Sequence, residues 1–142
     1  MEKTLGIDEA NVIISAARAH GRLLGLNPIS VAVLDAGGHL IAFARENGSS
    51  NLRPQIAIGK ASGALGLGVS SRKIGEMAIE RPTFIAAAGA ISQAGIIPAA
   101  GGVLVTDDAG RLLGAVGVTG DTSDNDELCA LQCIAAAGLS AR

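Results

Sequence analysis

The sequence has 142 residues, 49% of them hydrophobic, and a formal net charge of −2. This length predicts one domain over residues 1–142, and no apolar run approaches the roughly 18 residues that would cross a membrane. The absence of a Lys/Arg cluster, together with only two aromatic residues, both Phe, argues against a nucleic-acid-binding protein.

The high apolar content also bears on assembly and location. The excess consists of Ala, Gly and aliphatic residues, and a monomer of this composition would expose large apolar patches. We therefore expect a homo-oligomer, a dimer or larger. The first residues lack the basic segment and apolar core of a secretory signal, so a cytoplasmic location is expected.

Periodicity and turn signals predict helices before, between and after two β-hairpins. In chain order the predicted elements are a helix over 8–24 capped by Asp8, strands over 29–34 and 39–45, and helices from 54 to about 65, over 71–80 and over 83–93. A hairpin over 101–120 follows, with strands over 103–105 and 112–118, and then a helix over 122–139. Strands that come in adjacent pairs predict an α+β fold, with one antiparallel sheet built from two hairpins and flanked by helices.

The first helix carries a histidine among apolar residues. Its predicted inner stripe contains Val12, Ile13, Ala16, Ala17, Leu23 and Leu24. His20 falls on this stripe and is the only ionisable group there. It is either a core or interface residue with satisfied hydrogen bonds, or a ligand or general base.

Two charged residues end the first hairpin. Arg45 and Glu46 are either an exposed pair at the rim of the sheet or part of a site. In a site, Arg45 would bind a carboxylate with both guanidinium nitrogens, and Glu46 would accept a proton.

Further charged candidates lie on the second and last helices. Lys60 is either a surface lysine or a cation or base for a ligand. Asp126 and Glu127 either stabilise the start of the last helix or act as a catalytic carboxylate or a partner of Lys60 across a pocket.

Small residues supply two more predictions. Gly101 and Gly102 either form a tight chain reversal or offer backbone N–H groups to a carboxylate or phosphate. Cys129 and Cys133 are expected to be buried apolar side chains, because two cysteines without nearby histidines do not make a metal site.

Three stretches together resemble the GlcG/HbpS family, also called the haem-degrading domain family, which is related to the C-terminal domain of some cobalamin adenosyltransferases. They are VAVLDAGGHLIAFAR, IAIGKASGA and the segment from GGVLV through DDAGRLLGAVGVTG to DNDELCALQCIAAAGL. The resemblance implies a profilin-like sheet flanked by helices, and oligomers built through apolar surfaces. It also implies haem as a cofactor, with His20 as the axial iron ligand.

The sequence departs from this family in two places. The family usually has a proline where this chain has Leu104, and Arg-Met-Asp-Gly-Ala where this chain has Arg45-Glu46-Asn47-Gly48-Ser49. Both departures lie where the family's pocket is expected, so the ligand of this chain could differ.

Three functions remain open from the sequence. The first is a haem- or tetrapyrrole-binding, and in some relatives haem-degrading, oligomer in which Lys60 or Arg45 meets the propionates. The second is a cofactor-independent isomerase, hydrolase or lyase acting on a small organic acid or lactone, with Lys60 or Arg45 on the carboxylate and Glu46, Glu127 or His20 moving a proton. The third is an oligomeric scaffold.

Overall fold

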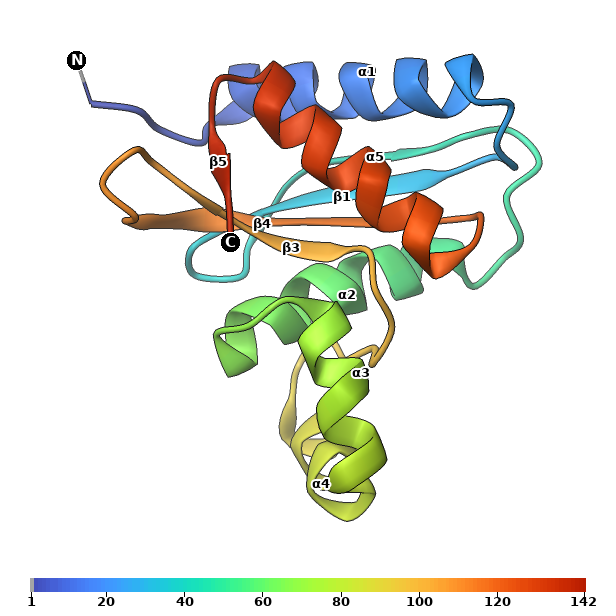
Figure 1. Ribbon diagram of the computed structural model, residues 1–142, viewed down its shortest axis with the longest axis vertical. Coiled ribbons are helices and arrows are strands. Elements are labelled where there is room, and N and C mark those ends of the chain that lie inside the picture. The colour runs from blue at the N-terminus through green and yellow to red at the C-terminus, as the bar shows by residue number, and fades with distance from the viewer. Residues whose placement is uncertain (1) are drawn as a thin grey trace.

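The two predicted hairpins join into one antiparallel sheet, described here by a computed structural model that covers residues 2–142 (Figure 1). The first hairpin is formed by β1 (Ser30–Asp35) and β2 (Leu40–Arg45), and the second by β3 (Gly102–Thr106) and β4 (Leu112–Thr119). β1 pairs with β4, which makes these two strands the centre of the sheet. The strand order is β2-β1-β4-β3-β5, and the predicted α+β fold is confirmed.

The last strand was not predicted. β5 (Ser140–Ala141) pairs with the outer edge of β3. Beside it, the backbone N–H of Leu104 donates to the carbonyl of Arg142 at 3.2 Å, and the carbonyl of Leu104 accepts from Arg142 at 2.9 Å. A proline at position 104 lacks this N–H. Leu104, unlike the proline that the family resemblance implies, therefore supplies the N–H for the first of these two hydrogen bonds.

Helices α1 (Ile7–Leu23) and α5 (Ser123–Ala136) cover one face of the sheet (Figure 1). Alternate residues along a strand face opposite sides. The side chains that enter the core between these helices and the sheet include Ile13, Val31, Val33, Val116, Val118, Cys133 and Ile134. This is the larger of the two apolar clusters among the described residues.

Helix α2 (Arg53–Leu67) covers the opposite face and approaches the strands very closely. A Cβ atom at Gly117 would overlap the carbonyl oxygen of Ala57, and one at Gly102 would overlap the carbonyl oxygen of Lys60. The inward side of α2 is itself made of small residues such as Ala61 and Ala64. Small residues on both surfaces therefore bring the helix backbone against the sheet.

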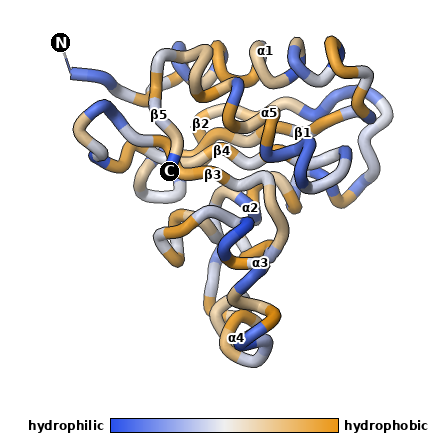
Figure 2. Tube along the Cα trace, in the orientation of Figure 1, coloured by the Kyte–Doolittle hydropathy of each residue, from blue (hydrophilic) through white to orange (hydrophobic). Residues whose placement is uncertain are grey.

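Helices α3 (Ser71–Glu80) and α4 (Pro82–Ile91) extend away from the sheet as an arm (Figure 1). The cap of α3 is Ser70, whose hydroxyl accepts from Lys73, while the hydroxyl of Ser71 accepts from the N–H of Gly102 at 2.6 Å. This second contact fixes the base of the arm to β3. Helix α4 is apolar almost throughout (Figure 2). Ile85 is nevertheless its one buried residue.

Two predictions about the first helix are wrong. The helix begins after Gly6, whose N–H is capped by the carboxylate of Glu9 at 2.8 Å, so Asp8 lies in the first turn. The buried side consists of Ala10, Ile13, Ile14, Ala17 and Gly21. Of the predicted stripe, Ile13 and Ala17 are buried, whereas Val12, Leu23 and Leu24 are exposed. His20 is half-buried beside the buried side.

The last helix is also less enclosed than expected. Most of its residues are apolar, yet Leu128 and Leu131 are exposed. Its N-cap is Thr122, whose hydroxyl accepts from Asn125. Among residues 2–142, none of the helices has the length and hydrophobicity required to span a bilayer.

The close approach of α2 predicts opposite effects for two glycine substitutions. We expect Gly117→Ala to lower the free energy of unfolding by about 2 to 3 kcal/mol, because the new methyl group displaces the backbone of α2. Gly66→Ala is the matched control, since Gly66 lies in α2 with open space around its Cβ position. It should raise stability by up to about 1 kcal/mol. Urea unfolding measures both, and equal stability of the two variants would contradict the close packing.

Candidate functional site

A buried ion pair joins the two sides of the sheet. The Lys60 ammonium, from α2, lies 3.2 Å from a carboxylate oxygen of Asp126, from the first turn of α5. Lys60 also donates to the carbonyl of Val118 at 2.9 Å, and Asp126 accepts from the N–H of Asp121 at 2.9 Å. Lys60 is 3% exposed and Asp126 is 1% exposed. The alternative of Lys60 as a surface lysine is therefore wrong.

Burial and pairing act against each other in this pair. Burial lowers the pKa of Lys60, and the charge of Asp126 opposes that shift. Burial likewise raises the pKa of Asp126, and the charge of Lys60 opposes it. The close contact and the additional backbone partners compensate part of the cost of removing two charges from water.

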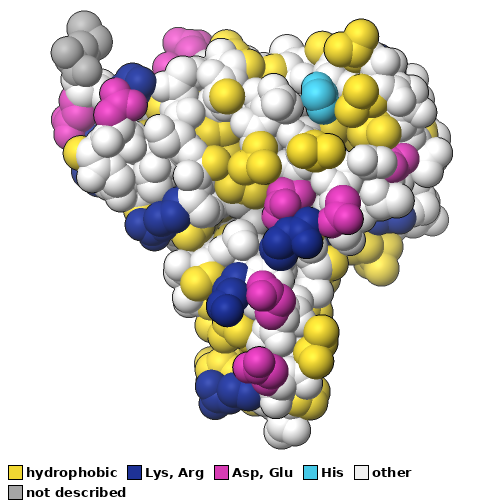
Figure 3. All heavy atoms as spheres, in the orientation of Figure 1, with side chains coloured by type: hydrophobic (Ala, Val, Ile, Leu, Met, Phe, Trp, Pro, Cys, Tyr) yellow, Lys and Arg dark blue, Asp and Glu magenta, His cyan; other side chains and the backbone are white. Residues whose placement is uncertain are grey.

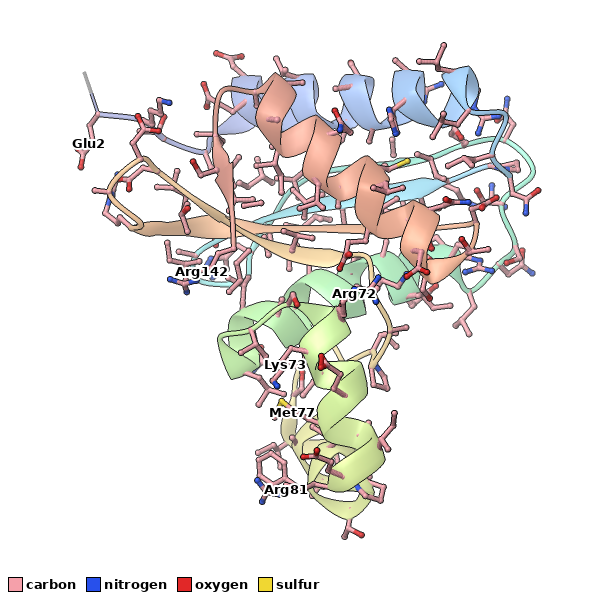
Figure 4. All side chains as sticks on the ribbon, in the orientation of Figure 1. Glu2, Arg72, Lys73, Met77, Arg81 and Arg142 are labelled. Carbon is pink, nitrogen blue, oxygen red and sulfur yellow. The ribbon has the colours of Figure 1, made fainter. Side chains whose placement is uncertain are left out.

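Glu127 does not share this contact. Its carboxylate accepts from the side chain of Arg72, which is labelled in Figure 4, at 3.0 Å. Arg72 also pairs with Asp124, so both acidic residues bind α3 to the start of α5. Next to them lies an open depression of about 580 Å³, whose lining includes Arg72, Pro98 and Asp124. Lys60 and Asp126 are not part of that lining, so the structure does not place Glu127 and Lys60 across a pocket.

Glu46 is held by two arginines of α1. It is 9% exposed, and its carboxylate lies 3.3 Å from Arg18 and 3.1 Å from Arg22. It also accepts from the backbone N–H of Ile29 at 2.9 Å. The expectation of an exposed rim residue is wrong for Glu46, because this carboxylate connects the end of β2, the start of β1 and α1.

Arg45 lies on the other side of the sheet from Glu46. Consecutive strand residues face opposite sides, so the Arg45 side chain is on the side of α2. It is exposed and donates to the carbonyl of Ser49 in the following loop. Arg45 and Glu46 therefore do not form one site.

Gly101 and Gly102 are buried at the start of β3. The N–H of Gly102 is used by the hydroxyl of Ser71, and the carbonyl of Gly101 accepts from Val118 at 2.9 Å. Gly101 has a φ of +129°, a conformation that glycine adopts readily. The N–H of Gly102 is thus not available for an anion, and the close approach of Lys60 explains why glycine is needed here.

His20 belongs to a line of apolar side chains on α1. At a spacing of four residues, Val12, Ala16, His20 and Leu24 follow one another along the helix. Exposed Leu128 of the adjacent α5 adds to the apolar character of this side. Figure 3 shows hydrophobic side chains gathered over α1 and α5. We call this region the α1–α5 surface; an open depression of about 490 Å³, lined in part by Val12 and Ala16, lies at its edge.

The two cysteines are buried in α5, as predicted. Burial raises the pKa of Cys129 to about 11 and that of Cys133 to about 12. Within residues 2–142, no group of three or more His, Cys, Asp or Glu side chains is arranged to hold a metal ion.

Sequence reasoning overlooked the contribution of Arg53. Its side chain donates to the hydroxyl of Thr119 at 2.7 Å. One signal was present in the sequence: an arginine occupies the first turn of a helix, where acidic residues are usual. The pairing of β1 with β4, which brings Thr119 beside Ser30, could not be read from either hairpin alone.

A comparison with protein families shows to which family this chain belongs. Residues 5–135 match the model of the family described as haem degrading protein HbpS-like. The chain belongs to this family. The resemblance inferred from the sequence is therefore confirmed. No curated protein sequence matches the chain.

Solved structures agree with this assignment. The crystal structure of HbpS is 25% identical, with a TM-score of 0.80 over 95% of this chain and 91% of that chain. A crystal structure of a PduOC–haem complex is 20% identical, with a TM-score of 0.84 over 97% of this chain and 98% of that chain. ORFY of Klebsiella pneumoniae, of family DUF336, is 22% identical, with a TM-score of 0.85 over 97% and 93%. The last two similarities establish the shared fold.

The Lys60–Asp126 pair predicts a strong coupling between two substitutions. We expect Asp126→Asn alone to lower the free energy of unfolding by about 3 to 5 kcal/mol, because it leaves a buried ammonium without its counter-ion. Adding Lys60→Met should recover part of that loss. Lys73→Met, at an exposed position, is the control and should change stability by less than about 0.5 kcal/mol. Strictly additive losses in urea unfolding would argue against the pair.

Proposed function

We propose that this chain binds haem on the α1–α5 surface, with His20 as the axial ligand. Membership of a family described as haem degrading supports the proposal, and so does the likeness in fold to a PduOC–haem complex. The observation that carries it is the placement of one imidazole in a line of apolar side chains, of which Val12 and Leu24 are exposed. A porphyrin needs such an apolar contact surface, together with a nitrogen ligand for its iron.

The residues on this surface fit haem in two respects. Leu24 and Leu128 are about half exposed, at 50% and 47%, so they are available to a flat apolar ligand. The His20 side chain has no hydrogen bond or ion pair among residues 2–142, which leaves its ring nitrogens free, while its backbone carbonyl accepts from Leu24. Bound haem would supply an iron centre for ligand exchange or redox chemistry. The part of the protein would be to ligate the iron and exclude water from one face of the ring.

The propionates need partners other than those expected from the sequence. Lys60 is buried against Asp126, and Arg45 lies on the α2 side of the sheet, away from α1. Of the basic residues of α1, Arg18 and Arg22 are about half exposed while they hold Glu46. They are the cations nearest in sequence to His20.

Haem degradation, the cytoplasmic location and the cofactor-independent reaction remain predictions.

Haem titration tests this proposal. We expect micromolar haem to give a saturable shift of the Soret band, and His20→Ala to weaken binding by at least about tenfold, because the iron loses its nitrogen ligand. His39→Ala is the matched control, since His39 is an exposed histidine paired with Asp35 at the turn of the first hairpin. The absence of a Soret shift, or equal binding by both histidine variants, would contradict the proposal.

We also propose that a second copy of this chain covers α4. Ile91 is 87% exposed and Ile79, on the adjoining α3, is 84% exposed. The arm reaches out from the sheet and shows apolar residues along α4 (Figures 1 and 2). An exposed apolar helix of this kind is typical of an oligomer interface. A second copy supplies an equally apolar helix, so two such arms bury each other's surface.

Sedimentation velocity tests the assembly. We expect the native chain to sediment as an oligomer, and Ile91→Glu to shift it to a smaller species, because a carboxylate would be buried in the apolar contact. Leu52→Glu, at an exposed leucine before α2, should leave the assembly unchanged. A monomeric native protein, or an oligomer unaffected by Ile91→Glu, would rule out this role of α4.

A further inference from the structure

A row of polar residues crosses three strands on the side of α2. Ser30 of β1 lies directly opposite Arg45 of β2 and opposite Thr119 of β4. Residues that face each other across antiparallel strands project to the same side and lie within about 5.5 Å at Cβ. Arg53, in the first turn of α2, donates to the hydroxyl of Thr119 at 2.7 Å, which identifies the side as that of α2. Two arginines therefore flank Ser30.

The hydroxyl of Ser30 has no hydrogen-bond partner within residues 2–142, although the residue is 0% exposed. The hydroxyl of Ser49 is likewise buried without a hydrogen-bond partner, and the carbonyl of Ser49 accepts from Arg45. Burying a hydroxyl without a partner costs stability. Two such hydroxyls beside the same arginine point to a group that accepts hydrogen bonds at this place.

The charge around this row is positive and incompletely balanced. Neither Arg45 nor Arg53 forms a salt bridge in the part of the chain that the structure describes. The first turn of α2 contains no acidic residue, and the cap residue Leu52 offers no side-chain acceptor. Besides burial, the charge of Arg53 lowers the pKa of Lys60, whose own counter-ion is Asp126. The start of α2 adds the positive end of a helix dipole.

We propose that Arg45, Arg53 and the Ser30 hydroxyl, at the start of α2, form a binding site for an oxyanion, the carboxylate or phosphate group of a small molecule. The arginines supply charged N–H donors in a fork that matches such a group. Ser30 donates its hydroxyl from the floor of the site, and the loop over 46–52 borders it (Figure 1). The site lies on the opposite side of the sheet from the α1–α5 surface, so it is independent of haem.

Binding of succinate and of inorganic phosphate tests this site, by calorimetry at constant ionic strength with chloride as the competing anion. We expect saturable binding of at least one of them below about 10 mM. Arg45→Gln and Arg53→Gln should each weaken it by at least about tenfold, because each removes a charge-assisted hydrogen bond. The stronger of the two ligands tells carboxylate from phosphate. Arg81→Gln is the matched control, since Arg81 is an exposed arginine that lies over Phe84 on the arm.

Ser30→Ala separates a binding role from a structural one. It should leave the melting temperature of the free protein unchanged or raised, since the hydroxyl has no partner to lose, and it should weaken oxyanion binding. Thermal melting of each variant without ligand shows that it is folded. Absence of saturable binding, or binding that the two arginine variants leave as strong as Arg81→Gln does, would overturn the proposal.

Discussion

The contact between Lys60 and Asp126 depends on every layer of this protein. Lys60 comes from the helix on one side of the sheet and Asp126 from the helix on the other, and the carbonyl of Val118 between them belongs to a central strand. The ammonium reaches this position because Gly101 leaves no side chain in its way, and Gly102 leaves room for the backbone of Lys60. A shift of α2 or α5 would leave a charge buried without its partner. The arrangement of the layers is thereby fixed at one point.

The end of β2 shows how one strand can serve two surfaces. Glu46 is directed to α1, where Arg18 and Arg22 hold it, and the preceding Arg45 is directed to α2. Glu46 thus belongs to the attachment of α1. Arg45 remains exposed and without a carboxylate partner among the described residues. The end of this strand therefore contributes one charged side chain to each side of the sheet.

The hairpins and most helices could be predicted from local signals, because turn glycines and apolar periodicity act within a few residues. The sequence analysis included a contact between Lys60 and Asp126 as one of several alternatives. Choosing this alternative would have required the pairing of β1 with β4, which no local sequence pattern contains. The inner side of α1 was misjudged because Leu23 and Leu24, both apolar, lie at exposed positions. A helix whose apolar residues cover two surfaces, one facing the core and one facing outward, has no single stripe to find. The two-residue strand β5 is too short for any periodicity.

The reactivity of the two thiols of α5 shows whether this helix is packed against the sheet. Cys129 and Cys133 are fully buried, and their raised pKa values leave almost no thiolate at neutral pH. Since the thiolate is the form that reacts with alkylating agents and peroxides, the folded chain should be inert to both. Reaction at either sulfur requires α5 to separate from the sheet. The rate of thiol labelling therefore reports how often the layer that carries Asp126 opens.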